Sequence, residues 1–359
     1  MILTKRIQLQ IDCREPEKRR EYYARIFGWQ NVAFRAANLV VTHQFLLQRI
    51  SELMYLSEGA KVRLSDEKVK SEGILNCSRM STTYRVISGH YKGKLPSYIL
   101  SALNRLAIRK YDAQQSAYWS GERSLSNHKK DMAMPFSGAV FRPVKEESGR
   151  NFVFKLFKVP FRTYLGRDRS DKFNILKRVA GGQLKVLSAA LQIVKGKIFL
   201  IISYEAKEAA NRLEEHVIAE ASLSAQHPIT VTIGRNSHQI GSTEEFLYRR
   251  MAIQSARSRL QAAAAWNRGG HGRKKKESAV RRLGDREKRY VEAKLHLYSR
   301  KLIDICTRSG AGTLLLVNQS AKEEAAKEDV FLLRNWSYYG LVTKIKYKAE
   351  LAGINVIVE

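Results

Sequence analysis

The pattern of apolar and polar residues predicts a strand and then a block of helices at the start of the chain. Residues 3–11, LTKRIQLQI, alternate with a period of two, as a half-buried strand does. Residues 15–29 and 32–55 carry apolar side chains at spacings of three and four, which predicts two helices. A third helix is predicted from Pro96 to Tyr111, with the proline in its first turn. The hydroxyl-rich stretch between the second and third helices has no predicted element.

From residue 133 onward the pattern is typical of β-structure. Alternating runs occupy residues 135–144, 152–166 and 187–206. Lys195-Gly196 lies between two alternating runs, where a hairpin turn is expected. A small barrel or strongly bent sheet is therefore predicted. The N-terminal strand is expected to join it, so that the helices form an insertion in a β domain.

After residue 208 strands and helices alternate. Strands are predicted at residues 217–223, 229–234, 313–317 and 354–359, and helices at 243–266, 279–307 and 336–351. This alternation predicts a mixed α/β layer. The fold class is thus α+β followed by α/β, in a chain of several domains.

Cysteine and histidine usage gives no support for a metal site. Cys13, Cys77 and Cys306 are isolated, and a zinc ribbon or redox dithiol needs paired cysteines. We therefore expect small buried hydrophobic residues at these positions. No run of apolar residues approaches the length of a membrane span, and the first residues do not resemble a signal peptide. A cytosolic protein with no membrane association is expected.

The charge of the chain points to a polyanionic partner. Lys and Arg number 64 against 34 Asp and Glu, a formal net charge of +30. Residues 268–301 alone hold thirteen Lys or Arg and four acids. Taken singly, such a run can be a solvated helix face. Because basic clusters recur along the whole chain, nucleic acid is the better interpretation.

Several segments carry a resemblance that covers nearly the whole chain. They are LRNWSYYGLVTKIKYKAELAGINV at 333–356, NCSRMSTTY at 76–84, YKG at 91–93 and GERSL at 121–125. Together with the order of elements, they resemble the TnpB family, transposon-encoded RNA-guided nucleases related to the type V CRISPR effectors. The resemblance implies a wedge-domain strand at 1–14, a helical recognition domain at 15–128, a wedge β-barrel at 129–213 and a RuvC-like (RNase H-like) domain at 214–359.

The resemblance also implies where catalytic carboxylates should lie. An active member uses three carboxylates on the RuvC fold to hold two divalent metals about 4 Å apart. The segment IAEASLS at 218–224 places Ser222 where the family has the first Asp, and Val317 falls where it has a Glu. The third carboxylate and the zinc ribbon lie beyond the position that matches Glu359, so all three ligands are expected to be missing. Glu220 lies about 7 Å from Ser222 along the strand, which is too far to restore the geometry.

The expected function is therefore binding without cleavage. The chain is most like TnpB-derived nuclease-dead repressors, which occupy a promoter and block transcription. This implies a guide RNA of the omega type, one protein per RNA, and target double-stranded DNA beside a short flanking motif, in the bacterial cytoplasm at the nucleoid. No cofactor is expected in the protein, and any Mg²⁺ is expected on nucleic-acid phosphates only. Two alternatives remain: a nuclease with rearranged ligands, and a general RNA-binding transposition accessory protein.

The nucleic-acid-binding residues are predicted from residue type. A hydroxyl and aromatic cluster with two cations is expected to read or clamp the flanking duplex, unless it is an ordinary polar connector: Arg79, Ser81, Thr82, Thr83, Tyr84 and Lys92. Basic residues are expected to hold the RNA or heteroduplex backbone: Lys129, Lys130, Lys274, Lys275, Lys276, Arg281, Arg282, Lys344, Lys346 and Lys348. Because alternate residues do not share one helix face, at least one of the last three should point to solvent.

Overall fold

The computed structural model describes residues 2–54, 78–146, 150–166, 171–206, 211–223, 227–242, 244–266, 277–317 and 338–359. The chain folds as two compact units, Ile2–Glu205 and Ala206–Glu359. The start of the last domain predicted from the sequence, residue 214, lies a few residues after this division. None of the helices in the described ranges combines the length and apolarity needed to cross a bilayer.

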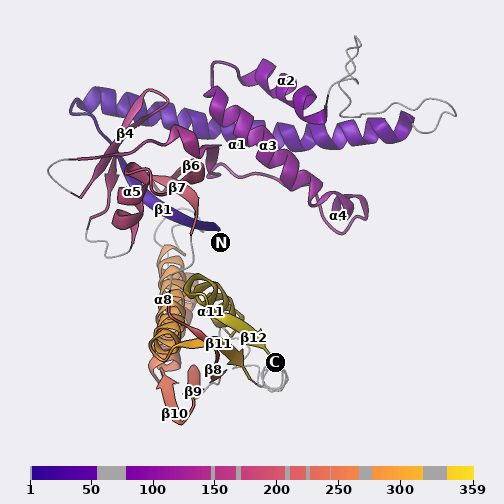
Figure 1. Cartoon of the computed structure of the whole chain (residues 1–359). Helices are drawn as coiled ribbons and strands as arrows, with labels where there is room; N and C mark the ends of the chain where they lie inside the picture. Colours follow the sequence, from indigo (N-terminus) through magenta and orange to yellow (C-terminus); the bar gives the residue numbers. More distant parts are fainter. Residues whose placement is uncertain are drawn as a thin grey trace. The chain divides into compact units, whose positions relative to one another are not determined.

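The N-terminal unit is built on a half-barrel sheet of seven antiparallel strands (Figure 1). The strands are β1 (Ile2–Ile11), β2 (Met134–Ser137), β3 (Val144–Lys145), β4 (Phe152–Leu156), β5 (Val159–Tyr164), β6 (Val186–Val194) and β7 (Lys197–Glu205), in the order β2-β6-β7-β1-β5-β4-β3. Because β1 pairs with both β7 and β5, the predicted entry of the N-terminal strand into this sheet is confirmed. The predicted hairpin at Lys195-Gly196 is also confirmed, with both residues at positive φ. A helix that the sequence pattern did not predict, α5 (Lys172–Ala180), precedes β6.

Among the described residues between β1 and β2 lie the helices α1 (Pro16–Met54), α2 (Arg79–Tyr91), α3 (Ser97–Asp112) and α4 (Gln115–Trp119). The prediction of two helices over residues 15–55 was wrong, since α1 is one continuous helix of 39 residues. Gln30, at the expected break, is buried and bonds the sheet instead of ending the helix. Its amide donates to the carbonyls of Lys130 and Ile193 and accepts from the Ile193 N–H.

The hydroxyl-rich stretch forms the helix α2. Ser78 caps its first turn by accepting from the Ser81 N–H, and the Thr82 and Thr83 hydroxyls donate to carbonyls four residues earlier. Bonds of this kind let hydroxyl residues lie inside a helix without leaving their polar groups unpaired. The sequence pattern therefore underestimated the helical content here.

The C-terminal unit has a mixed sheet of five strands: β8 (Glu214–Ser222), β9 (Ile229–Ile233), β10 (Asn236–Ile240), β11 (Ala311–Leu316) and β12 (Asn355–Val358), in the order β10-β9-β8-β11-β12. The first three are antiparallel, and β11 and β12 run parallel to β8. The helical elements in the described part of this unit are a π-helical turn (Glu244–Tyr248), α6 (Arg249–Trp266), α8 (Ser278–Arg308) and α11 (Tyr338–Ala352). A mixed α/β layer is therefore present, as the sequence predicted.

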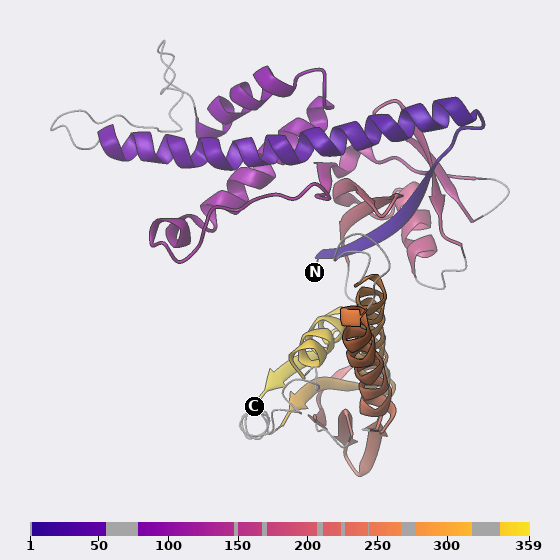
Figure 2. The same cartoon turned by 180° about the vertical axis from the view of Figure 1, so that it is seen from behind.

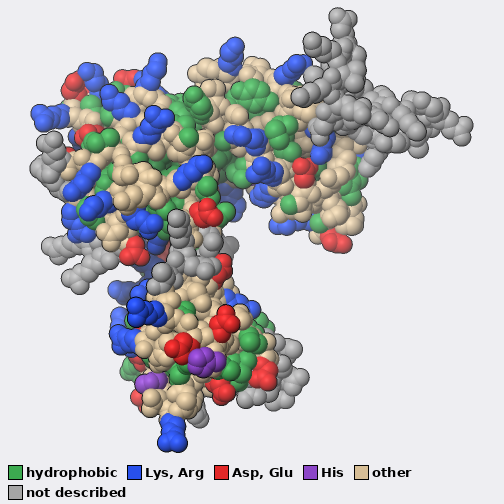
Figure 3. Space-filling view, in the orientation of Figure 1, with side chains coloured by type: hydrophobic (Ala, Val, Ile, Leu, Met, Phe, Trp, Pro, Cys, Tyr) green, Lys and Arg blue, Asp and Glu red, His purple; other side chains and the backbone are tan. Residues whose placement is uncertain are grey.

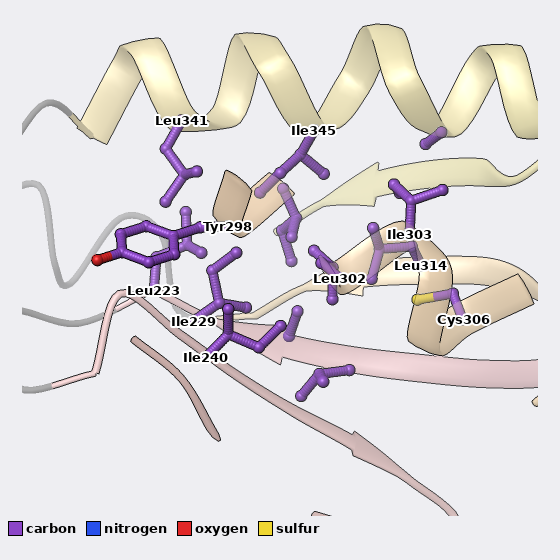
Figure 4. Close-up of a cluster of buried hydrophobic side chains, with 14 of the residues drawn as sticks. Leu223, Ile229, Ile240, Tyr298, Leu302, Ile303, Cys306, Leu314, Leu341 and Ile345 are labelled. Carbon is purple, nitrogen blue, oxygen red and sulfur yellow. The ribbon is translucent and has the colours of Figure 1, made fainter. Parts of the chain in front are cut away.

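The core of this unit lies between the sheet and the helices α8 and α11 (Figure 4). Leu341 and Ile345 point from α11 toward the sheet, and Tyr298 and Leu302 do so from α8. Cys306, one of the three isolated cysteines, is fully buried here, and burial raises the pKa of its thiol to about 11. Its expected role as a small hydrophobic residue is confirmed.

Candidate nucleic-acid interface and strand edge

Ser222 and Val317 lie side by side at the carboxyl ends of two neighbouring parallel strands. Leu316 of β11 is in register with Ala221 of β8, and the Val317 N–H donates to the Ala221 carbonyl at 3.1 Å. Ala221 and Leu316 are buried under the helices, so Ser222 and Val317 belong to the opposite face of the sheet. The two positions that the family resemblance assigns to catalytic carboxylates are therefore adjacent on one face of the sheet.

A third strand ends at the same place. Val358 of β12 is in register with Leu316, and the N–H of Glu359 donates to the Leu316 carbonyl at 3.1 Å. We call Ser222, Val317 and Glu359 the strand edge. It presents a hydroxyl, an isopropyl group and one carboxylate. Within the described ranges, no group of three or more His, Cys, Asp or Glu side chains is arranged to hold a metal ion.

Glu220 is exposed on the same sheet face as Ser222. It is in register with Thr232 of β9 and Leu315 of β11, and it precedes Ser222 of the strand edge by two residues. Its neighbours therefore add no carboxylate, and it lies a full strand repeat away from Ser222.

The N-terminal unit contains a cleft of about 850 Å³ between α1, α2, the segment leading into α3 and the β4–β5 turn. We call it the aromatic cleft. Its lining combines rings with cations: Trp29, Tyr84, Tyr98, Phe157, Arg25, Lys92, Lys94 and Lys158. Rings of this kind can stack on bases, and the cations can meet phosphates. In the view of Figure 3, Lys and Arg side chains are spread over this unit and acidic ones are sparse.

The β4–β5 turn is held in an unusual conformation at this cleft. Phe157 and Lys158 both have positive φ, +51° and +67°, in a two-residue hairpin turn where glycine or asparagine is usual. Such residues are strained by on the order of 1–3 kcal/mol each. Packing offsets the strain, because the Phe157 ring meets Trp29 edge-on at 6.0 Å and Phe136 at 5.4 Å. The turn thereby places Lys158 on the wall of the cleft. The sequence pattern does not reveal these two residues, because only their positive φ distinguishes them.

The residues predicted to read the flanking motif lie on or next to the helix α2, but their side chains have different surroundings. Tyr84 and Lys92 line the aromatic cleft, and Ser81 is exposed. The guanidinium of Arg79 lies 3.4 Å from the carboxylate of Asp112, and the Thr82 hydroxyl donates a hydrogen bond to the Ser78 carbonyl.

Thr83 cannot meet a nucleic acid from its place in this structure, because it is fully buried. Its hydroxyl donates to the Arg79 carbonyl and accepts from the Gln44 amide, 2.5 Å away, beside His43 Nδ1 at 2.9 Å. We correct its assignment from reading the duplex to packing α2 on α1.

The basic residues predicted to bind RNA also differ in their surroundings. Lys129 and Lys130 are exposed at the junction of helices and sheet, and Arg281 and Arg282 are exposed on α8. Lys274, Lys275 and Lys276 lie outside the described residues.

The three lysines of α11 have different surroundings. Lys344 pairs with Glu292 of α8 at 2.8 Å, and Lys348 donates to the His296 carbonyl and the Ser299 hydroxyl. Burial, with Arg300 and Lys344 nearby, lowers the pKa of Lys348 to about 8. Lys346 is exposed. We correct the assignment of Lys344 and Lys348, which tie α11 to α8, and Lys346 remains as a candidate phosphate contact.

Comparison with known proteins gives a relative along most of the chain. The CRISPR-associated endodeoxyribonuclease Cas12f1 of Sulfoacidibacillus thermotolerans is 26% identical over 360 residues, which covers 92% of this chain and 82% of that protein. A second Cas12f1, from Syntrophomonas palmitatica, is 32% identical over 90 residues, 18% of its length. No protein-family model matches the chain.

The fold is shared with a solved effector. The cryo-EM structure of a Cas12f1-sgRNA-target DNA complex matches with a TM-score of 0.66 and 14% identity, over 95% of this chain and 76% of that one. The chain is thus similar in sequence to a Cas12f1 over most of its length and shares the fold of the protein in that complex.

Proposed function

We propose that this relative of Cas12f1 binds double-stranded DNA under the direction of a guide RNA and does not cut it. The curated relatives are named endodeoxyribonucleases, and the solved structure of the same fold is a complex with sgRNA and target DNA. A net charge of +30 suits two long polyphosphate partners. Base pairing with the guide selects the sequence, and the protein reads a short flanking motif and the shape of the heteroduplex.

The strand edge is the observation that supports the absence of cleavage. Two-metal hydrolysis needs charged oxygen ligands on both ions, because magnesium is a hard cation that must be held while water is activated. At the adjacent ends of β8 and β11 the chain offers a neutral hydroxyl, from Ser222, and an alkyl group, from Val317. These residues do not fit a pair of magnesium ions. No catalytic step is therefore assigned to this edge, and any Mg²⁺ is expected on phosphates of the bound nucleic acids.

The core of the same unit supports a retained scaffold rather than general decay. Ala219, Ala221, Leu314 and Leu316 alternate regularly with the outward positions and pack under α8 and α11. Unselected change would alter inward and outward positions alike. A coherent inward set suits a protein that needs this unit to bind. Without cleavage, stable occupancy of a promoter is the remaining effect, so we assign the chain as a steric repressor of transcription.

The first experiment recovers and sequences the RNA that copurifies with the full-length chain from its native host. A labelled duplex that matches the guide is then tested for binding, and a supercoiled plasmid with the same site is incubated with the complex and Mg²⁺. We expect nanomolar-range binding that depends on the guide match, and an intact plasmid. A duplex with mismatches next to the flanking motif serves as the matched control, since these mismatches abort pairing at its start.

The outcomes separate the rival functions. Magnesium-dependent nicking that is lost on Glu220→Ala would show a nuclease with rearranged ligands. Binding that is equally strong for matched and mismatched duplexes would show a general nucleic-acid-binding accessory protein. A reporter gene under the matched promoter tests repression itself, which should disappear when the guide sequence is scrambled.

A further inference from the structure

A second cleft, of about 1040 Å³, lies at the end of β1 in the N-terminal unit. We call it the β1 cleft. Its floor is the end of β1 with neighbouring β5 and β7, and one wall is the start of α1. The chain passes from β1 directly into α1 (Figure 2). The strand edge and the aromatic cleft contribute no residue to it.

The lining is strongly basic. Five cationic side chains border the cleft: Arg14, Arg19, Arg20, Arg162 and Lys197. Arg19 has a structural bond, because its guanidinium donates to the Cys13 carbonyl at 3.2 and 2.7 Å and thereby fixes the turn between β1 and α1. Arg14, Arg20 and Lys197 are exposed. A concave surface with this excess of cations attracts phosphates.

The floor of the cleft also carries two side-chain amides, which are not required for binding phosphates. Gln10 of β1 is in register with Arg162 of β5, and Gln8 is in register with Phe199 of β7, so both amides share the sheet face of the arginine. Arg162 is held in place by Glu146, whose carboxylate lies 2.5 Å from its guanidinium. A side-chain amide donates and accepts at once and can bond the edge of an unpaired base.

Two carboxylates, Asp12 and Glu146, lie among these cations. Glu146 is paired with Arg162, and Asp12 is exposed at the strand end, where its N–H donates to the Pro160 carbonyl at 3.1 Å. An ionised carboxylate only accepts hydrogen bonds, and a DNA backbone offers it acceptors alone. A ribose carries a 2′-hydroxyl that can donate to it. Asp12 therefore weakens the cleft toward a DNA backbone and suits an RNA one.

We propose that the β1 cleft holds an unpaired segment of the guide RNA. Arg14, Arg20 and Lys197 contact its phosphates, Gln8 and Gln10 bond base edges, and Asp12 accepts from a ribose 2′-hydroxyl. This inference rests on the proposed use of a guide RNA and adds a site that distinguishes ribose from deoxyribose.

The test uses the full-length chain, freed of copurified RNA by high salt, and two labelled probes: the recovered guide RNA and its all-deoxy copy. Arg20→Ala should weaken binding of the RNA about tenfold, as expected for a charged hydrogen bond. It should also lower the slope of log affinity against log salt by about 0.7. Lys18→Ala is the matched control, since Lys18 is an exposed cation on the same helix that does not line the cleft. Equal losses in the two variants would reduce the effect to general charge and overturn the proposal.

Asp12→Ala tests the ribose contact. We expect the preference for the RNA over its deoxy copy to fall severalfold, whereas Asp131→Ala, an exposed acid outside the cleft, leaves that preference unchanged. Affinities for both probes that rise together in Asp12→Ala would show that the carboxylate acts by charge alone, and would overturn the ribose assignment. A wild-type chain that binds neither probe would refute the proposed function itself, so the two failures are distinguishable.

Discussion

The strand edge of the C-terminal unit and the aromatic cleft of the N-terminal unit differ in the chemistry that their side chains offer. The strand edge joins three parallel strand ends in hydrogen-bonded register, and it offers a hydroxyl and an alkyl group at the ends of β8 and β11. The aromatic cleft has rings and cations suited to bases and phosphates. The two sites therefore differ in the ligands that their side chains could bind.

The difference shows how the chemistry of a site can vary without any effect on the fold. Ser222 and Val317 lie on the sheet face away from the core, so their identity has little influence on packing. Tyr84 and Lys92 also lie outside the core, and their ring and ammonium group suit bases and phosphates. Side chains that face away from the core report function, and those that face the core report only the fold.

The largest effect should separate the core of the C-terminal unit from its strand edge. Leu302 is fully buried between α8 and the sheet, so Leu302→Ala should lower the free energy of unfolding of this unit by about 2–5 kcal/mol. Ser222→Ala, in the same unit, should change it by less than about 0.5 kcal/mol. Hydrogen exchange of the α8 amides measures the free energy of unfolding of this unit in both variants. A large loss in Ser222→Ala would show that the edge is part of the stabilising structure.

The next effect divides two neighbours on α2. Thr83→Ala removes the partner of the buried Gln44 amide and should destabilise the helical insertion by about 1–3 kcal/mol. Tyr84→Ala should leave stability nearly unchanged and weaken binding of the matched duplex by about 1–3 kcal/mol, the usual loss of one stacked ring. Thermal unfolding and duplex binding are measured on both variants. A reversal, with Thr83→Ala impairing binding in a stable protein, would restore Thr83 as a reader.

This pair illustrates what the sequence could predict. Periodicity placed most strands and helices, because the core of each unit follows the two structural repeats closely. It did not reveal that Thr83 faces inward. A threonine hydroxyl can donate to a carbonyl of its own helix, so a polar residue can occupy a buried position that the apolar pattern does not mark. The same reason explains Gln30, a polar residue whose partners, Lys130 and Ile193, are distant in sequence.

The clefts were even less accessible to sequence reasoning. The aromatic cleft joins three segments, and the β1 cleft joins residues from positions 8 to 198. Basic residues along the chain predicted a polyanion, but not which of them are available. Lys344, Lys346 and Lys348 look alike in sequence, and their roles differ because α8 covers one side of α11.

The smallest effect concerns this lysine series. The pKa of Lys348 is lowered to about 8 by burial, so the unfolded chain binds more protons than the folded one between about pH 8 and 10.5. Stability should therefore rise with pH across this window. Because the lysine is only half-buried, solvent screening limits the rise to about 1 kcal/mol.

Lys348→Met should abolish this rise, and Lys346→Met should keep it, because Lys346 is exposed. The effects of the two variants on the salt dependence of nucleic-acid binding should be the reverse of their effects on stability. Lys346→Met lowers the salt slope by about 0.7–0.9, the contribution of one phosphate contact, and Lys348→Met leaves it unchanged. Denaturant midpoints at pH 7.5 and 10 and binding at two salt concentrations complete the test. If Lys348→Met alone changed the salt slope, α11 would meet the nucleic acid through the face that here packs against α8.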